Sequence, residues 1–355
     1  MPVTHQGVTL HLGPRQVGAP DDLEAAIVDF IDGAERELRV AVQEIDHPPI
    51  AEAILRAKRR GVRLMDVVLE ADYLREPKAP PAGKDGAHHG NRLLANAMLR
   101  EAIDVKADFN PSIFHQKFIV RDGTAVLTGS TNFTTTGVTQ NLNHVVVIED
   151  RTVAQEFRRE FLEINRGIFG RLSDAHGRAP KEARVGGLRI KPLFAPEHAP
   201  EMEIMKMMAK ARSRVDFAIF TFAQSSGIDD QMIATVQRGV TVRGVLDGKQ
   251  ANHAWAASKG LHAAGVQLHR PRRRGSGIRK VHHKLMVIDG EVVVTGSFNY
   301  TGPANSVNDE NILIIGTADD ADPAGRAAQM RFGAAALGEI ERMIHDHCEP
   351  FTPRP

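Results

Sequence analysis

Residues 281–299 read VHHKLMVIDGEVVVTGSFN, and this stretch decides the fold because the chain contains a second copy of it. Residues 115–132 read HQKFIVRDGTAVLTGSTN, and both copies fit the pattern H-x-K-x4-D-x6-G-S-x-N without a gap. The alignment pairs His282 with His115 and places His283 opposite Gln116. An internal repeat of this kind indicates two copies of one structural unit, and it selects His282 as the motif histidine.

The similarity continues outside the motif. Residues 24–45 align with 201–222, and residues 50–71 align with 232–248. In each pair, apolar positions at helical spacing lead into an apolar segment typical of a strand. We therefore expect an α/β protein of two duplicated halves related by a pseudo-twofold axis, each a mixed β-sheet flanked by helices. The expected boundaries are 1–167 for the first half, 168–186 for a linker and 187–355 for the second half.

The predicted order of elements in each half is helix, strand, helix, then three strands and a closing helix. The closing helices are expected at 152–165 and at about 322–346. Gly61 and Gly239 follow the second helix of each half, where a left-handed residue commonly ends a helix. Residues 75–90, rich in proline and glycine, are expected to form a loop.

Composition excludes several classes of protein. Hydrophobic residues make up 42% and charged residues 25% of the 355 residues, which is typical of a globular protein. The net charge is +1, so any preference for an anionic partner has to be local. Cys348 is the single cysteine, which excludes an intramolecular disulfide and a cysteine-based zinc site. The absence of a signal sequence and of a long apolar run predicts a cytoplasmic protein.

Two motif histidines in one site can cleave a phosphodiester. One imidazole attacks phosphorus while the other protonates the departing oxygen, and the second imidazole then activates the water that hydrolyses the phosphohistidine. Histidine suits both roles because its ordinary pKa lies close to neutral pH. Two β-hairpins of a duplicated domain, kept only for packing, would not have to preserve these residues at identical spacing.

The other motif residues are expected to support this reaction. Lys117 and Lys284, two residues after each histidine, would lie on the same face of their strands and contact the non-bridging phosphoryl oxygens. Further donors to phosphate are expected from the amides of Asn132 and Asn299 and from the hydroxyls of Ser130 and Ser297. These groups supply positive charge themselves, so we expect neither a metal ion nor another cofactor.

The motif aspartates, Asp122 and Asp289, stand just before a glycine at the end of a strand. A role in capping the turn or in a salt bridge is expected for them rather than direct chemistry.

With these residues in place, the sequence resembles the phospholipase D superfamily, whose members carry two such His-Lys-Asp motifs in one active site. The resemblance extends from about residue 20 to 345. It implies a metal-independent phosphohistidine mechanism, with the two halves pressed together along their motif strands, so that a monomer is sufficient and a dimer is possible.

In this superfamily a carboxylate after each motif hydrogen-bonds the motif histidine. Glu310 in the second half matches it and is the expected partner of His282, while Asn143 occupies the aligned position in the first half. Because an amide cannot raise imidazole basicity as a carboxylate does, the site is expected to be asymmetric, with His282 as the more basic ring. Which histidine is the nucleophile stays open, and His283 and His144 are expected to be supporting or structural.

The substrate class is less sharply indicated. The segments VHHKLMVIDG, TGSFNYT and NDEN resemble small bacterial endonucleases and their mitochondrial relatives more than secreted phospholipases. A basic stretch before the second motif could bind backbone phosphates, although a solvated surface loop is the plainer interpretation. Its members are Arg270, Arg272, Arg273, Arg274, Arg279 and Lys280.

The favoured interpretation is a nuclease that cleaves DNA or RNA. The first alternative is a phospholipase D-type hydrolase or transferase acting on phospholipid head groups. The second is a non-catalytic protein that binds phosphate or nucleic acid, which Asn143 would mark as a decayed site. The sequence does not distinguish a DNA substrate from RNA or a single strand from a double strand. It also does not distinguish endonuclease from exonuclease cleavage.

Overall fold

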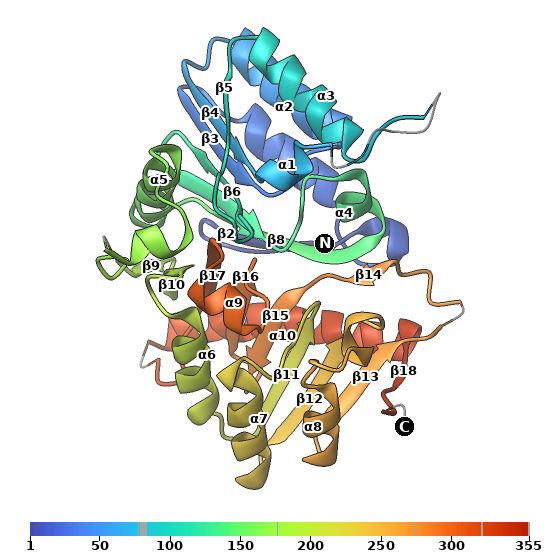
Figure 1. Ribbon diagram of the computed structural model, residues 1–355. Helices are drawn as coiled ribbons and strands as arrows, with labels where there is room; N and C mark the ends of the chain where they lie inside the picture. The colour runs from blue at the N-terminus through green and yellow to red at the C-terminus, as the bar shows by residue number, and fades with distance from the viewer. Residues whose placement is uncertain (77, 79–83, 176, 274, 321, 354–355) are drawn as a thin grey trace.

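The computed structural model describes the chain except residues 77, 79–83, 176, 274, 321, 354 and 355. Two nine-stranded mixed sheets lie one in each half, as Figure 1 shows with the first half above the second. The α/β class and the two similar halves predicted from the repeat are confirmed. The segment expected as a linker contains a short 3-10 helix, η3 (Gly170–Ala175), and a strand, β9 (Ala183–Val185), which pairs with the second sheet.

The first sheet has the strand order β1-β2-β8-β7-β6-β3-β4-β5, with β14 of the second half beside β8. Its strands are β1 (Val3–His5), β2 (Val8–Gly13), β3 (Glu37–Val42), β4 (Leu64–Leu69), β5 (Asp104–Ala107), β6 (Lys117–Arg121), β7 (Ala125–Gly129) and β8 (Asn141–Ile148). The helices of this half are α1 (Leu23–Asp32), α2 (Pro48–Arg59), α3 (His89–Arg100), α4 (Thr135–Thr139) and α5 (Arg151–Asn165), with 3-10 turns η1 (Arg15–Val17) and η2 (Ala71–Tyr73).

The second sheet has the order β18-β13-β12-β11-β15-β16-β17-β10-β9. Its further strands are β10 (Leu188–Ala195), β11 (Arg214–Ile219), β12 (Thr241–Leu246), β13 (Gln267–Pro271), β15 (Lys284–Ile288), β16 (Val292–Gly296), β17 (Glu310–Ile315) and β18 (Cys348–Pro350), while β14 is Lys280–Val281. The helices are α6 (Pro200–Ala209), α7 (Gly227–Gln237), α8 (Ser258–Ala263), α9 (Gly302–Ser306) and α10 (Pro323–His347), with the 3-10 turn η4 (Gln250–Asn252).

The sequence pattern locates the elements shared by the two copies of the repeat and omits several others. The closing helices α5 and α10 lie within one residue of their predicted bounds, and Gly61 and Gly239 have the positive φ expected of them, 100° and 84°. The strands β2 and β10, and the α3–β5 and α8–β13 units, are additions to the predicted order. The place of these segments is set by pairing and packing with distant residues, which local periodicity does not reveal.

Three buried clusters hold these layers together. The outer faces of the two sheets pack on α1, α2 and α3 in the first half and on α6, α7 and α8 in the second. The inner faces share one cluster with α5 and α10, to which Phe157, Phe161, Phe332 and Ile340 contribute fully buried side chains. Burial of this shared apolar surface presses the two halves together.

Backbone hydrogen bonds also cross between the halves beside each motif. The amide of His282 donates to the carbonyl of Leu142 at 2.9 Å, where β14 runs parallel to β8. The amide of His115 donates to the carbonyl of Asp309 at 3.0 Å. Each motif histidine is therefore held by the other half of the chain, and Figure 1 shows β14 reaching toward β8 across the boundary.

Among the described residues, no helix is both long and apolar enough to span a lipid bilayer.

Candidate active site

The two motif histidines lie at the interface between the halves. His115 lies two residues before the start of β6 and His282 two residues before the start of β15, and their exposed fractions are only 7% and 6%. Each ring contacts the other half of the chain: Nδ1 of His115 lies 2.7 Å from Oε2 of Glu310, and Nδ1 of His282 lies 3.1 Å from the carbonyl oxygen of Ser130. The predicted convergence of the two motifs into one centre is therefore present in the structure.

Glu310 contacts the histidine of the opposite half, and this corrects the expectation that it pairs with His282. Its Oε2 lies 2.7 Å from Nδ1 of His115. Glu310 is the first residue of β17, which belongs to the second sheet, and the neighbouring carbonyl of Asp309 binds the His115 backbone. The carboxylate therefore supports His115 across the interface, which removes the reason for expecting His282 to be the more basic ring.

His282 has an amide partner instead. Its Nδ1 lies 2.9 Å from Oδ1 of Asn143 and 3.1 Å from the carbonyl of Ser130. The Asn143 amide nitrogen donates to the carbonyl of Gly137 at 2.9 Å, so its oxygen is the atom that faces the ring. Since both nearby atoms are acceptors, Nδ1 of His282 carries a proton, and Nε2 is the nitrogen left for chemistry.

The motif serines orient these partners, which corrects their expected role as donors to phosphate. Ser130 donates its hydroxyl to Oδ1 of Asn143 at 2.8 Å, and Ser297 donates to Oε2 of Glu310 at 2.6 Å. The glycine before each serine is required by close backbone approach: a Cβ on Gly296, whose φ is 143°, would lie 2.2 Å from the carbonyl oxygen of Asn311. The Gly-Ser pair thus brings the two last strands of a half together and holds the histidine's partner.

The motif lysines lie beside the motif histidines. Lys117 donates to the carbonyl of His115 at 2.8 Å and to Oε1 of Gln43 at 3.2 Å. Lys284 donates to the carbonyl of His282 at 2.9 Å, and its Nζ lies 3.3 Å from Nε2 of the same ring. Both ammonium groups are therefore placed to meet oxygens of an anion bound between the histidines.

The two motif asparagines differ. Asn132 donates its amide nitrogen to Oε1 of Gln43 and of Glu44, at 3.2 and 3.0 Å, so these donors are engaged by protein. Asn299 uses its oxygen to accept from the backbone amide of Thr221 at 3.2 Å. The expected role as a phosphate donor thus fits Asn299, whose amide nitrogen makes no hydrogen bond within the described residues, better than Asn132.

An aromatic ring borders the second histidine. Phe220 follows β11 and its ring centroid lies 4.8 Å from that of His282. The ammonium groups of Lys280 and Lys284 lie 5.3 and 5.2 Å from the same centroid, which is within the range of a cation–π contact. Gln43 occupies the aligned position in the first half, so the two sides of the site differ in polarity.

Burial controls the electrostatics of the centre. It lowers the pKa of both histidines well below the usual value, and the two lysines lower these pKa values further. Burial also lowers the pKa of Lys117 to about 7, against the opposing effect of Glu310, and raises the pKa of Glu310 to about 8. An anion bound here would favour the charged lysines, so this group of residues is suited to a phosphoryl ligand.

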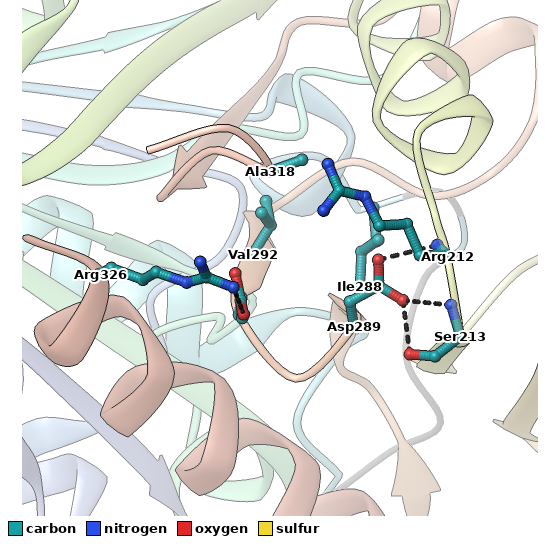
Figure 2. A pocket seen from close by; sticks show the side chains of 8 residues that line it. Arg212, Ser213, Ile288, Asp289, Val292, Ala318 and Arg326 are labelled. Carbon is teal, nitrogen blue, oxygen red and sulfur yellow. Dashed lines mark hydrogen bonds and ion pairs between the residues drawn. The ribbon is translucent and has the colours of Figure 1, made fainter. Parts of the chain in front are cut away.

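The motif aspartates cap turns on the far side of their strands, as the sequence predicts. Asp289 accepts hydrogen bonds from the backbone amides of Arg212, Ser213 and Arg214 at 2.8–3.0 Å, and from the Ser213 hydroxyl. Figure 2 shows this arrangement, in which the Asp289 carboxylate faces the 212–213 segment. Asp122 accepts from the amides of residues 35–37 in the same way.

The basic stretch before the second motif divides into two groups. Arg270 pairs with Glu349 at 3.1 Å, and Arg272 donates to the carbonyls of Asp346 and His345 at the end of α10. These two guanidinium groups have structural partners. Arg273, Arg279 and Lys280 are exposed, and Arg274 lies outside the described residues.

Two carboxylates that the sequence pattern did not single out anchor the motif backbones. Glu70, directly after β4, accepts from the amide of Phe114 at 2.6 Å, and Asp247, directly after β12, accepts from the amide of Val281 at 3.2 Å. Phe114 and Val281 each precede a motif histidine. The signal available in the sequence was the acid that ends VVLE and GVLD at aligned positions of the repeat.

A second layer of paired side chains lies beneath the histidines. His283 and His144 contact each other through Nδ1 atoms 3.0 Å apart, and their rings stack at 5°. The aligned residues of the repeat, Gln116 and Asn311, form the matching pair through a 2.7 Å hydrogen bond. His283 and His144 are therefore supporting residues of the interface, as expected.

One carboxylate group outside the centre has spacing compatible with a metal ion. Glu160, Glu163 and Glu197 place an oxygen each within 4.8 Å of one another. Burial and the neighbouring carboxylates raise the pKa of Glu160 well above its usual value, which favours a carboxyl sharing a proton within the group.

Comparison with known proteins identifies the family. The model described as "Cardiolipin synthase, PLD-like domain" matches residues 27–165 and 204–328, which include both motifs. The chain belongs to the phospholipase D-like family. The predicted resemblance to this superfamily is confirmed.

Individual relatives carry lipid-related names. The chain is 32% identical over 130 residues to the mitochondrial cardiolipin hydrolase of Xenopus laevis, covering 36% of this chain and 54% of that protein. It is 29% identical over 136 residues to a phospholipase D of Rickettsia felis, covering 38% and 60%. The chain thus spans little more than half the length of these relatives.

Among solved structures, the phosphatidylserine synthase of Haemophilus influenzae shares the fold. The TM-score is 0.66 at 14% identity, and the match covers 96% of this chain and 87% of that one. At this identity the likeness concerns the fold alone.

Proposed function

We propose that this member of the phospholipase D-like family is a phosphodiesterase that acts through a phosphohistidine. The observation that carries the proposal is the pairing of His115 with Glu310 and of His282 with Asn143 across the interface. Each pairing engages Nδ1 and leaves Nε2 for chemistry. Lys117 and Lys284 flank the same space and supply the charge for non-bridging oxygens.

The carboxylate on His115 supports its role as the nucleophile. In the productive form Glu310 is ionised and Nδ1 of His115 carries the proton, so Nε2 attacks phosphorus and forms a P–N bond. The bond from phosphorus to the leaving oxygen breaks as Nε2–H of His282 protonates that oxygen. His282 then takes a proton from water, whose oxygen attacks phosphorus, and the P–N bond breaks to restore His115.

Nucleic acid is the substrate class that we favour. The support is the exposed basic side chains of Arg273, Arg279 and Lys280 in the segment that leads to His282, which suit a polyanionic backbone. We expect cleavage of DNA or RNA oligomers with EDTA present, and loss of turnover in His115→Ala and His282→Ala.

Phospholipid is the second candidate, favoured by the names of the relatives and by an apolar surface. Phe109 and Leu172 are 66% and 59% exposed, and both line a pocket together with Phe169. A substrate panel in EDTA separates the candidates: linear and circular DNA, RNA and phospholipid vesicles. Release of head groups without cleavage of any nucleic acid would replace the nuclease proposal. Tight oligonucleotide binding by wild type and histidine variants alike, without turnover, would indicate a non-catalytic binding protein.

A further inference from the structure

A basic pocket borders the catalytic centre on the side of His282. It has a volume of about 360 Å³ and is formed where β12 and β13 end and the loop toward β14 begins. Five basic side chains line it, and this set is called the basic pocket below. Its members are Lys249, Arg270, Arg272, Arg273 and Arg279.

Two contacts connect the basic pocket to the catalytic histidine. Asp247 lines the pocket and accepts from the amide of Val281, the residue before His282. The backbone amide of Arg279 donates to the carbonyl of Gln140 at 3.2 Å, so the pocket wall is attached to the first half. The wall of the basic pocket is therefore connected to the backbone that positions His282.

The positive charge in the pocket is largely uncompensated. Asp247 is the one acidic residue in the lining, and its oxygens already accept from three backbone amides, of Lys249, Gln250 and Val281. In the described part of the chain, no carboxylate pairs with Lys249, Arg273 or Arg279. These three exposed cations are free to bind an anion.

The corresponding side of the first half has a different character. The loop after β5 and the residues facing it form a pocket in which Arg171 is the single basic residue, and Phe109, Phe169 and Leu172 contribute apolar surface. The pseudo-twofold symmetry is therefore broken in charge. A chain of phosphates would be attracted to the side of His282 and not to that of His115.

We propose that the basic pocket binds the backbone phosphate next to the scissile one in a nucleic acid strand. The assignment rests on the proposed nuclease function and specifies how the substrate lies across the site. Lys249, Arg273 and Arg279 contact the neighbouring phosphate, while Arg270 and Arg272 hold the pocket in shape through Glu349 and the end of α10.

The test compares substrates that have and lack a neighbouring phosphate, with EDTA present. Dithymidine monophosphate and diuridine monophosphate contain one phosphodiester each, and 20-residue thymidine or uridine oligomers contain many. The variant Lys249→Ala/Arg273→Ala/Arg279→Ala is expected to raise KM for the oligomers about tenfold and to leave the dinucleotides unaffected. The dependence of log(kcat/KM) on log salt should become shallower by about 0.7, the value for one phosphate contact on a single strand.

A matched control removes the same charge elsewhere. Arg36 and Arg63 precede β3 and β4, at the ends of these strands opposite to Gln43 and Glu70, and Lys181 lies before β9; all three are exposed. Arg36→Ala/Arg63→Ala/Lys181→Ala should keep the wild-type KM and salt dependence. Unchanged dinucleotide cleavage shows that the pocket variant is folded.

The outcomes separate the two proposals. Equal KM and salt dependence in wild type and pocket variant, with cleavage intact, would overturn the pocket assignment and leave the nuclease function standing. Absence of cleavage of any of these substrates by wild type would overturn the nuclease function itself. Vesicle hydrolysis that the pocket variant loses, with oligomers uncleaved, would reassign the pocket to a phospholipid.

Discussion

Single residues decide how the two histidines differ. Glu310 places a carboxylate on His115, and Asn143 places an amide on His282, so two rings with identical motifs have chemically different partners. A carboxylate stabilises imidazolium and orients the ring, whereas an amide does only the second. The asymmetry supports the proposal that His115 is the nucleophile, a choice that the sequence left open.

This asymmetry predicts the effect of Glu310→Gln. We expect kcat/KM to fall about 10²-fold, because the variant keeps a hydrogen-bond acceptor and loses the charge. Burial raises the pKa of Glu310 to about 8, so wild-type activity should rise as pH increases through that value, and this limb should be absent from the variant. The measurement is kcat/KM against pH on a dinucleotide.

Asn143→Asp is the matched control for Glu310→Gln. It adds a carboxylate to His282 without removing one from His115, and it should raise the pKa of His282. The alkaline limb of the profile, on which activity falls as His282 loses the proton that it donates, should then move to higher pH. A large loss in Asn143→Asp together with full activity in Glu310→Gln would assign the nucleophile to His282 instead.

At the level of elements, the ends of β4 and β12 set the position of each catalytic backbone. Glu70 and Asp247 hold the residues that precede His115 and His282. Glu70→Ala is expected to lower kcat about 10²-fold with KM little changed, because small displacements of reacting groups have effects of that size. Glu70→Gln retains an acceptor oxygen and should recover most of the loss. Equal kcat losses in the two variants would show that charge, and not position, is the contribution of Glu70.

Turns at the other end of the strands govern stability. Partial burial would raise the pKa of Asp289, but the amides of Arg214, Arg212 and Ser213 outweigh this effect and hold the pKa below its usual value. A depressed pKa stabilises the fold above about pH 4, the unfolded value, and this stabilisation is lost as pH falls through the folded pKa.

Asp289→Asn should therefore lower the free energy of unfolding by about 1–2 kcal/mol at pH 7, with a smaller difference near pH 3. Urea unfolding at both pH values measures this. A constant difference in free energy between the two pH values would show that the charge of Asp289 is not the stabilising feature. Loss of kcat in a folded Asp289→Asn variant would contradict the placement of Asp289 away from the catalytic centre.

At the level of the whole molecule, the interface contains two matching pairs, each with one residue from each half: His144 with His283, which can titrate, and Gln116 with Asn311, which is neutral. Burial lowers the pKa of His144 well below its usual value and also lowers that of His283. Glu339 opposes the shift of His283, while Arg342 and Lys284 reinforce it. In contrast, Gln116 and Asn311 do not titrate.

The interface should therefore weaken in mild acid. The unfolded chain protonates these histidines near pH 6.5 and the folded chain only at lower pH, so stability is complete above about 6.5 and declines as pH falls. His283→Gln/His144→Asn copies the Gln116–Asn311 pair. The loss of melting temperature between pH 7 and 5 should be smaller in this variant than in wild type. Identical losses would exclude the pair as the acid-sensitive element.

Much of the molecule could be predicted from the sequence because a repeat reports on structure directly. Alignment of the two copies identified His115, His282 and both lysines, and the apolar periodicity indicated the long strands and the closing helices. The sequence also predicted that Asp122 and Asp289 cap turns, since each aspartate directly precedes a glycine in the chain. All of these features depend on residues that are close in sequence or related by the repeat.

Contacts between the halves depended on the tertiary structure. The partner of His115 is 195 residues away, and which half supplies it follows from how β8 and β17 cross the interface. The same packing decides that Ser130 and Ser297 form hydrogen bonds with Asn143 and Glu310. It also decides which arginines before the second motif have structural partners and which do not. The sequence by itself determined which groups form the site, because motif residues retain their spacing. Only the folded chain decided which groups meet, because side-chain hydrogen bonds require approach within about 3 Å.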